Sequence, residues 1–298
     1  MKFTNAAKSY KADVLILGGD MTGKLLIPIV RHSNGSFTAD FLGANLTMKT
    51  PAEVESLEKK IRNSGYYPYR ADESELAEWS ADRTKVDDAF SRAMVESVER
   101  WVKIAEERLR GSGIKCFITP GNDDRPVIEE ALAHSDCVSN PEGKVVDLNG
   151  YNEMISLGYS NLTPWKAPRD IPEEELELKI EKMASEVRSM KDCVFNMHCP
   201  PYNTPLDSAT EVDKNLKPVL EGGKPKAIAA GSVAVRKAIE KYQPLLGLHG
   251  HIHESRGAFK LRRTTCINPG SEYTEGILRG VIVDVEKKGV KAFLMTSG

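Results

Sequence analysis

Side chains with metal-binding chemistry follow short apolar runs at four places in the chain. Asp20, Asn122, His198 and His251 each come within a few residues of the end of a run typical of a buried strand. Ligands of α/β proteins bind at the carboxyl ends of strands, so we expect these residues to converge although they are far apart in sequence. Carboxylate, amide and imidazole groups without thiolates describe a site for zinc, manganese or iron.

Three of the six histidines lie in one stretch, His249–His253. Alternate residues of an extended chain point to the same side, so His251 and His253 face one ion or two neighbouring ions. Two ions about 3.5–4 Å apart can clamp a phosphoryl group and share a hydroxide nucleophile. Each residue alone also fits a loop cap, a turn or a structural histidine. It is the whole set, in this order, that predicts a metal site.

Strands alternate with helices along the chain, which predicts an α/β fold. The pair Asn34-Gly35 predicts a two-residue hairpin turn, and Thr50 with Glu53 predicts a capping box at a helix start. The C-terminal hairpin requires some antiparallel pairing. The expected strands include Asp13–Leu17, Ile114–Thr119, Cys193–Met197 and Leu245–Leu248, together with the hairpins Leu25–Arg31/Phe37–Leu42 and Val281–Val285/Val290–Met295. The expected helices include those following Thr50 and Asp170 and the segments Phe90–Leu109 and Ser232–Tyr242.

Composition excludes several classes of protein. The 298 residues include 41 Lys plus Arg and 43 Asp plus Glu, a net charge of −2, so no basic surplus indicates a nucleic-acid or anionic-membrane surface. The longest apolar stretches are far shorter than the roughly 20 residues of a membrane-spanning helix, and no secretory pattern opens the chain. We therefore expect a cytoplasmic protein. The five cysteines contain no C-x-x-C pair and are interpreted as free thiols.

Four motifs occur in the order found in a known family. Gly19–Gly23, Gly121–Asp124, His198 and Gly250–His253 resemble blocks of the calcineurin-like metallophosphoesterase superfamily, and Asn268–Ser271 is also typical of it. The resemblance spans residues 14–285. It implies a four-layer αββα sandwich of two mixed sheets, a single domain over residues 1–298 with helical insertions at about 43–110 and 160–191.

The resemblance also implies an activity and a set of ligands. In the family pattern Asp20 bridges two metals, Asn122, His198 and His251 complete one site, and His253 belongs to the other. The implied enzyme hydrolyses a phosphomonoester or phosphodiester by a metal-bound hydroxide. The implied cofactors are divalent or trivalent metal ions, chosen from manganese, iron and zinc. Its partner is a small-molecule phosphate ester, with neither a nucleic acid nor a membrane.

One block of the family pattern is absent. A D-x-H block should precede the strand Asp13–Leu17, and residues 1–13 contain no histidine. Half of one metal site and the first core strand are therefore expected to be missing. One metal, with reduced activity, is expected for a chain that starts at Met1. Our hypothesis is that Met1 is an internal methionine, because Met1–Lys11 resembles the helix that would follow the missing strand.

Asp123 stands where the family usually has a histidine that protonates the leaving group or contacts phosphate. A carboxyl group can act as a general acid when burial or a neighbouring anion raises its pKa toward neutrality, and Asp124 is adjacent. Asp123 is thus a candidate catalytic residue together with Asn122.

Other functions fit parts of the sequence. Gly18–Lys24 nearly spells the phosphate loop of NTPases, but Leu25 cannot supply the hydroxyl for magnesium and Pro28 disrupts the helix that should follow. A degenerate family member that serves as a metal-binding or protein-binding module is the main alternative, and carbon-centred metal hydrolysis is a third. The segment Asn161–Asp170, with Arg169, is expected to be a surface connection rather than a cover for the metal site.

Overall fold

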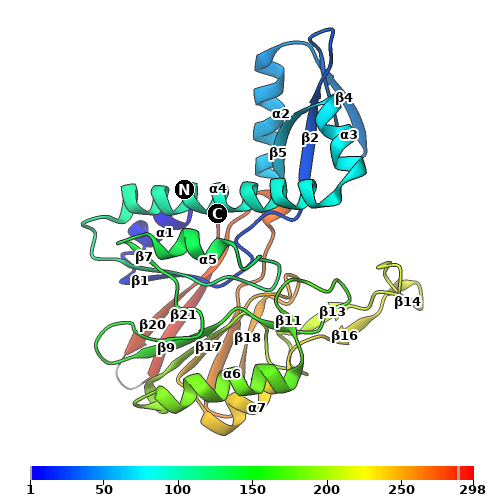
Figure 1. Ribbon diagram of the computed structural model, residues 1–298. Coiled ribbons are helices and arrows are strands. Elements are labelled where there is room, and N and C mark those ends of the chain that lie inside the picture. The colour runs from blue at the N-terminus through cyan, green and yellow to red at the C-terminus, as the bar shows by residue number, and fades with distance from the viewer. Residues whose placement is uncertain (1, 287–288) are drawn as a thin grey trace. The chain divides into compact units, whose positions relative to one another are not determined.

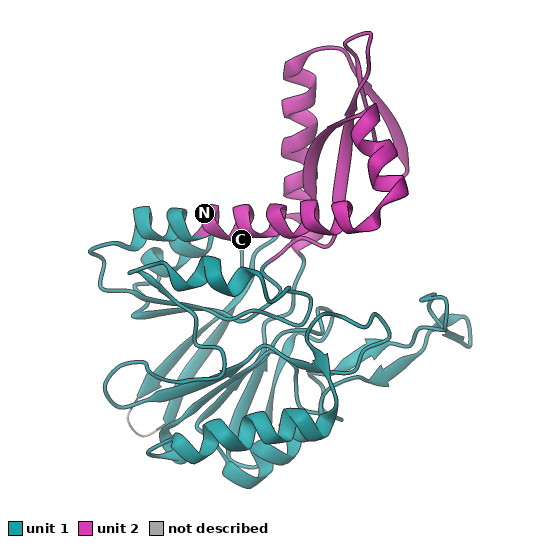
Figure 2. Cartoon of the chain, in the orientation of Figure 1, with its two compact units in different colours: residues 1–21, 102–272, 277–298 teal, residues 22–101, 273–276 magenta. Residues whose placement is uncertain are grey.

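The computed structural model describes residues 2–286 and 289–298. The chain forms two compact units (Figure 2), of which unit 1 comprises residues 1–21, 102–272 and 277–298 and unit 2 comprises residues 22–101 and 273–276. Helix α4 (Arg83–Leu109) runs from unit 2 into unit 1. Unit 2 contains a sheet as well as helices, where the sequence predicted only helices over most of 43–110. The expected division of the chain into one domain with two insertions stays a prediction.

The largest sheet of unit 1 has six strands, in the order β18-β19-β17-β12-β9-β8. Its four inner strands are parallel, and the edge strands β18 and β8 pair antiparallel. The bounds are β8 Val145–Asp147, β9 Glu153–Leu157, β12 Val194–Met197, β17 Leu246–Leu248, β18 Gly257–Leu261 and β19 Thr264–Asn268. Parallel inner strands place the loops after β9, β12 and β17 along one edge of this sheet.

A second layer of strands covers one face of the six-stranded sheet. It consists of the parallel sheet β1-β6-β7 and the antiparallel hairpin β20–β21. Side chains from both layers, among them Val14, Phe117, Val194 and Val281, form one apolar cluster between them. The bounds are β1 Val14–Leu17, β6 Lys115–Ile118, β7 Val138–Ser139, β20 Arg279–Glu286 and β21 Gly289–Ser297.

Helices complete an α/β sandwich. Helices α6 (Glu173–Glu186) and α7 (Val233–Tyr242) pack on the other face of the six-stranded sheet through a cluster that includes Ile180, Phe195 and Ile239. Helices α1 (Lys2–Ser9) and α5 (Ile128–Ala133) lie beside the β1-β6-β7 sheet (Figure 1). The layer order in unit 1 is therefore helix, sheet, sheet, helix, which confirms the α/β sandwich expected from the sequence.

Strand β1 pairs with β6 and forms the edge of its sheet among the described residues. The expectation that a core strand is missing beside β1 stays a prediction. The chain after β1 does not enter a helix but continues through Asp20 to strand β2 (Leu26–Arg31). Because a phosphate loop must lead into a helix, the structure removes the NTPase alternative.

Short paired strands project from the six-stranded sheet. The pairs are β10 (Ser160–Asn161) with β11 (Asp170–Ile171), β13 (Ser208–Thr210) with β16 (Ala227–Ala229), and β14 (Leu220–Glu221) with β15 (Lys224–Pro225). The structure also contains two 3₁₀ turns, Met190–Asp192 and Tyr273–Glu275.

Unit 2 is a four-stranded mixed sheet, β4-β3-β2-β5, with its own core. The predicted capping box is present, because Thr50 Oγ1 accepts from Glu53 N–H and Glu53 Oε2 accepts from Thr50 N–H. The hairpin turn is longer than predicted, since His32 N–H donates to the Ser36 carbonyl and only Gly35 has positive φ. The bounds are β3 Phe37–Phe41, β4 Ala44–Met48, β5 Tyr67–Asp72, α2 Pro51–Asn63 and α3 Glu73–Ala81.

Candidate metal site

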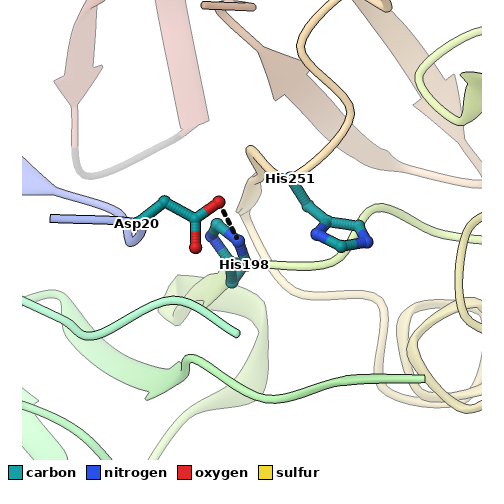
Figure 3. Close-up of side chains that lie close together, drawn as sticks. All are labelled: Asp20, His198 and His251. Atoms are coloured by element: carbon teal, nitrogen blue, oxygen red, sulfur yellow. Dashed lines mark ion pairs between the residues drawn. The ribbon is translucent and has the colours of Figure 1, made fainter. Parts of the chain in front are cut away.

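Four predicted ligands converge at the carboxyl edge of unit 1. Asp20 and Asn122 follow strands β1 and β6 of the three-stranded sheet, whereas His198 and His251 follow β12 and β17 of the six-stranded sheet. The site thus lies where the ends of two stacked sheets meet. Figure 3 shows the ion pair between the Asp20 carboxylate and the His198 ring, with the His251 ring on the opposite side of His198 from Asp20.

The donor atoms lie at contact distance. His198 Nε2 is 3.3 Å from Asp20 Oδ2 and 3.2 Å from Asn122 Oδ1, and His251 Nδ1 is 2.9 Å from the same Asn122 oxygen. One ligand atom each from Asp20, His198 and His251 lies within 4.8 Å of the other two. For metal–ligand bonds of about 2.1 Å, neighbouring donors are roughly 3.0–3.4 Å apart in an octahedral or tetrahedral shell. The observed spacing fits one ion.

The hydrogen bonds on the far side of each imidazole fix which nitrogen faces the site. His198 Nδ1–H donates to the Gly18 carbonyl at 2.9 Å, so its Nε2 atom faces the oxygens of Asp20 and Asn122. His251 Nε2 lies 3.2 Å from Ser160 Oγ, which can accept from Nε2–H when Nδ1 presents its lone pair inward. Such outer partners orient histidine ligands in metal sites.

The cluster attracts positive charge. Burial alone lowers the pKa of His198, but the charge of Asp20, its hydrogen bond and the Gly18 carbonyl outweigh burial and raise the pKa to about 9. Without a cation the His198 ring therefore carries a proton between the oxygens of Asp20 and Asn122. A metal ion and this proton occupy the same place and compete for it.

Backbone conformation at the site is unusual and tightly packed. Asp20 and His251 have left-handed φ values of 51° and 63°, which non-glycine residues adopt rarely. A Cβ atom at Gly19 would lie 2.2 Å from His198 Nδ1, and one at Gly121 would lie 2.2 Å from the Asp20 backbone nitrogen. No larger residue fits at either position, because the loops that carry the candidate ligands are in contact there.

Asp170 and Arg169 hold the Asn122 loop, although the sequence predicted a different role for each of them. Asp170 was expected to cap helix α6, but the helix begins at Glu173, and Asp170 Oδ1 instead accepts from Asn122 Nδ2 at 2.9 Å. Arg169 was expected in a surface connection, and this expectation is wrong, because its side chain is fully buried. Arg169 Nε–H donates to the Asp124 carbonyl at 3.0 Å. No motif spacing could have revealed either contact.

Asp124 belongs to the scaffold. Its buried Oδ2 atom accepts from the N–H groups of Gly121, at 2.7 Å, and Met21, at 2.9 Å, and so ties the two ligand loops together. Asp123 contributes its backbone N–H to Asp20 Oδ1 at 3.2 Å, and its side chain is half-buried. The roles proposed for Asp123 stay predictions.

His253 and His249 differ from the four central residues. His253 is half-buried and is not among the residues that the structure groups around a candidate ion within its described part. Its place in a second metal site stays a prediction. His249 is buried, and its Nδ1–H donates to the carbonyls of Met197 and Cys199 on either side of His198. It supports the His198 backbone from outside the site.

Cys199, next to His198, is not a thiolate. Burial raises the pKa of its thiol to about 12, and the Sγ–H group donates to Asn161 Oδ1 at 3.0 Å. The donors that surround the candidate ion are therefore oxygen and nitrogen only, the set that suits manganese, iron or zinc.

Glu142 carries a titratable carboxyl group where the two sheets approach. Its Oε2 atom accepts from Gly158 N–H at 2.7 Å, and a Cβ on Gly158 would lie 1.9 Å from the Pro120 carbonyl. Burial raises the pKa of Glu142 to about 7, against 4.5 for the free group. The folded state therefore holds this proton up to about pH 7, whereas the unfolded state releases it near pH 4.5.

The stability that Glu142 contributes should consequently fall as the pH rises from 4.5 to 7. We expect Glu142→Gln, which is neutral throughout, to gain stability relative to the wild type between pH 5 and pH 8, by at most about 3 kcal/mol. Urea unfolding at both pH values measures the difference. Identical pH dependence in the two proteins would show that Glu142 is ionised in the folded state.

Within residues 2–286 and 289–298, no helix combines the length and the apolar character needed to cross a bilayer.

Comparison with known proteins shows that another solved structure has a similar fold. No family model matches the chain. The uncharacterized protein MJ1162 of Methanocaldococcus jannaschii is 28% identical over 178 residues, which are 59% of this chain and 70% of that protein. One solved crystal structure aligns with 100% of this chain and 91% of its own, with 17% identity and a TM-score of 0.56. The crystal structure of TT1561 of Thermus thermophilus aligns with 68% of this chain and 79% of its own, at 16% identity and a TM-score of 0.43. The full-length alignment shows that this α/β fold occurs in another solved protein.

Proposed function

We propose that this protein is a metal-dependent phosphoesterase that hydrolyses a small-molecule phosphomonoester or phosphodiester. The observation that carries the proposal is the convergence of Asp20 Oδ2, Asn122 Oδ1, His198 Nε2 and His251 Nδ1, each of which lies 2.9–3.3 Å from at least one of the others. The order of these residues along the chain matches the metallophosphoesterase pattern, and the α/β sandwich is the fold that this pattern implies.

The residues present fit one divalent ion such as manganese, iron or zinc. Asp20 supplies the negative charge, Asn122 a neutral oxygen, and the two imidazoles a neutral nitrogen each. A bound ion of this kind polarises a phosphoryl oxygen and lowers the pKa of water. His253 is proposed as a ligand of a second ion, together with Asp20.

The chain's own groups hold and donate protons at this site. His198 must give up its Nε2 proton when the ion binds, while its Nδ1–H stays on the Gly18 carbonyl. The backbone N–H of Asp123 neutralises part of the Asp20 charge. We propose that the Asp123 carboxyl donates a proton to the leaving oxygen, the role that its position in the motif implies.

Asp123→Asn tests this proton transfer. We expect turnover to fall by about 100-fold while the metal content is unchanged, because the amide keeps the shape of the side chain and cannot donate an acidic proton. Elemental analysis and steady-state kinetics on the same samples measure both quantities. An equal loss of metal and turnover would make Asp123 a ligand instead.

The proposed function itself is tested on the purified full chain. The protein is stripped with chelator, reloaded with manganese, iron or zinc, and assayed with p-nitrophenyl phosphate and bis(p-nitrophenyl) phosphate. Bound metal with metal-dependent turnover of either ester supports the proposal. Bound metal without turnover of any ester overturns it in favour of a metal-binding module, and no bound metal favours a protein-binding module.

A further inference from the structure

The segment Ser160–Ile171 contacts the loops that carry three of the four candidate ligands, Asn122, His198 and His251. Ser160 Oγ lies 3.2 Å from His251 Nε2, and Asn161 accepts from the thiol beside His198. Arg169 N–H donates to the Asn122 carbonyl at 3.1 Å, and Asp170 accepts from the Asn122 side chain. The sequence had assigned this segment to the surface.

Asp170 is anchored so that only one of its oxygens is available to Asn122. Its Oδ2 atom accepts from Thr163 N–H at 3.0 Å, from Ala167 N–H at 2.9 Å and from the Thr163 hydroxyl. Its Oδ1 atom faces Asn122 Nδ2 at 2.9 Å. All the partners of the carboxylate named here are hydrogen-bond donors. Each side of the residue 170 side chain must therefore present an acceptor oxygen.

This arrangement determines which way the Asn122 amide points. An amide has an oxygen on one side and an NH₂ group on the other, and a 180° rotation exchanges them. Because Asp170 Oδ1 accepts, the NH₂ group of Asn122 must face Asp170, and its oxygen must face His198 and His251. The opposite orientation would direct two N–H donors at the ion.

We propose that Asp170 is a positioning residue that holds the Asn122 oxygen in the metal site, with the segment Ser160–Ile171 acting as a clamp on the Asn122 loop. The inference rests on the proposed metal site and adds the group that makes Asn122 a ligand. The buried guanidinium of Arg169 fixes the same loop by its bond to the Asp124 carbonyl and stacks 5.2 Å from the Tyr159 ring centre.

The variant Asp170→Asn should rotate the Asn122 side-chain amide by 180°. The three donors at the Oδ2 position select the oxygen of the new amide, so its NH₂ group must face Asn122. Asn122 then turns its own oxygen toward position 170 and its NH₂ group into the site. We expect the affinity for Mn²⁺ or Co²⁺, measured by calorimetry, to fall by about 10- to 100-fold, the range for lost outer-sphere partners.

A charge swap provides the decisive control. In the double variant Asp170→Asn with Asn122→Asp, the new carboxylate accepts from the NH₂ group at position 170 and presents its second oxygen to the ion. The total charge is that of the wild type. We expect metal affinity and the visible spectrum of bound Co²⁺ to return, whereas Asn122→Asp alone sets two carboxylates against each other and destabilises the protein.

The outcomes separate the clamp from the proposed function. Wild-type affinity in Asp170→Asn, or no recovery in the double variant, overturns the positioning role even if the wild type hydrolyses esters. A wild type that binds no metal overturns the proposed function, and the clamp is then judged on the melting temperature of the metal-free proteins. Recovery of the melting temperature by the double variant supports the pairing, and additive losses overturn it.

Discussion

Asp20→Ala is expected to abolish metal binding and metal-dependent turnover together. Asp20 carries the negative charge nearest to His198, and its Oδ2 atom is 3.3 Å from the His198 nitrogen that faces the site. Its removal leaves only neutral donors for a cation. The loss of affinity should exceed the 10- to 100-fold range typical of outer-sphere partners, because a direct ligand is removed. Calorimetry with Mn²⁺ and ester hydrolysis on the same preparation measure both effects.

The control for Asp20→Ala is a carboxylate of the same type outside the site. Asp40 lies exposed in strand β3 of unit 2 and accepts from the Asn45 side chain. Asp40→Ala should leave metal affinity and turnover at wild-type values. Retention of either property in Asp20→Ala would contradict the metal site described above.

Gly121→Ala is expected to damage the site without removing any ligand. The added Cβ would lie 2.2 Å from the backbone nitrogen and 2.3 Å from Oδ1 of Asp20, closer than real Cβ contacts allow. Backbone cannot move aside as a flexible side chain can, so Asp20 or the Asn122 loop must shift. We expect metal affinity to fall at least 10-fold, with a loss of stability of about 1–3 kcal/mol, typical of overpacking.

Calorimetric metal titration and thermal unfolding check this prediction, and Gly257→Ala is its matched control. The nearest atom to a Cβ at Gly257 is Leu206 Cδ2 at 3.4 Å, an ordinary contact with a flexible side chain. That variant should bind metal like the wild type. If Gly121→Ala also binds metal normally, the two ligand loops are farther apart than the structure places them.

The order of the strands and of the candidate ligands could be predicted from the sequence. Apolar runs that end in polar residues gave β1, β6, β12 and β17 and placed Asp20, Asn122, His198 and His251 at their carboxyl ends. This succeeds because a buried parallel strand needs a continuous apolar segment, and its first polar residues fall where the strand leaves the core. The capping box at Thr50 was equally local and was confirmed.

Local patterns failed where a residue had two possible partners. Asp170 is of a residue type that commonly caps helices. Its carboxylate instead accepts hydrogen bonds from Thr163, Ala167 and Asn122, and helix α6 starts three residues later. Asn34-Gly35 predicts a tight turn, yet the strands are joined by a longer loop. For Asp170 the partner Asn122 lies 48 residues away in the sequence, outside the short window that the pattern covers.

The sequence by itself determined the alternation of strands and helices, the position of each candidate ligand at a strand end, and the chemistry of the candidate donors, because these depend on residue type and local spacing. Only the tertiary structure decided that two separate sheets bring each donor within 3.3 Å of another, that Gly121 must be glycine, and that Asp170 contacts Asn122. These features depend on contacts between segments tens of residues apart, and the energy of such a contact is set by packing in space, which leaves no periodic trace along the chain.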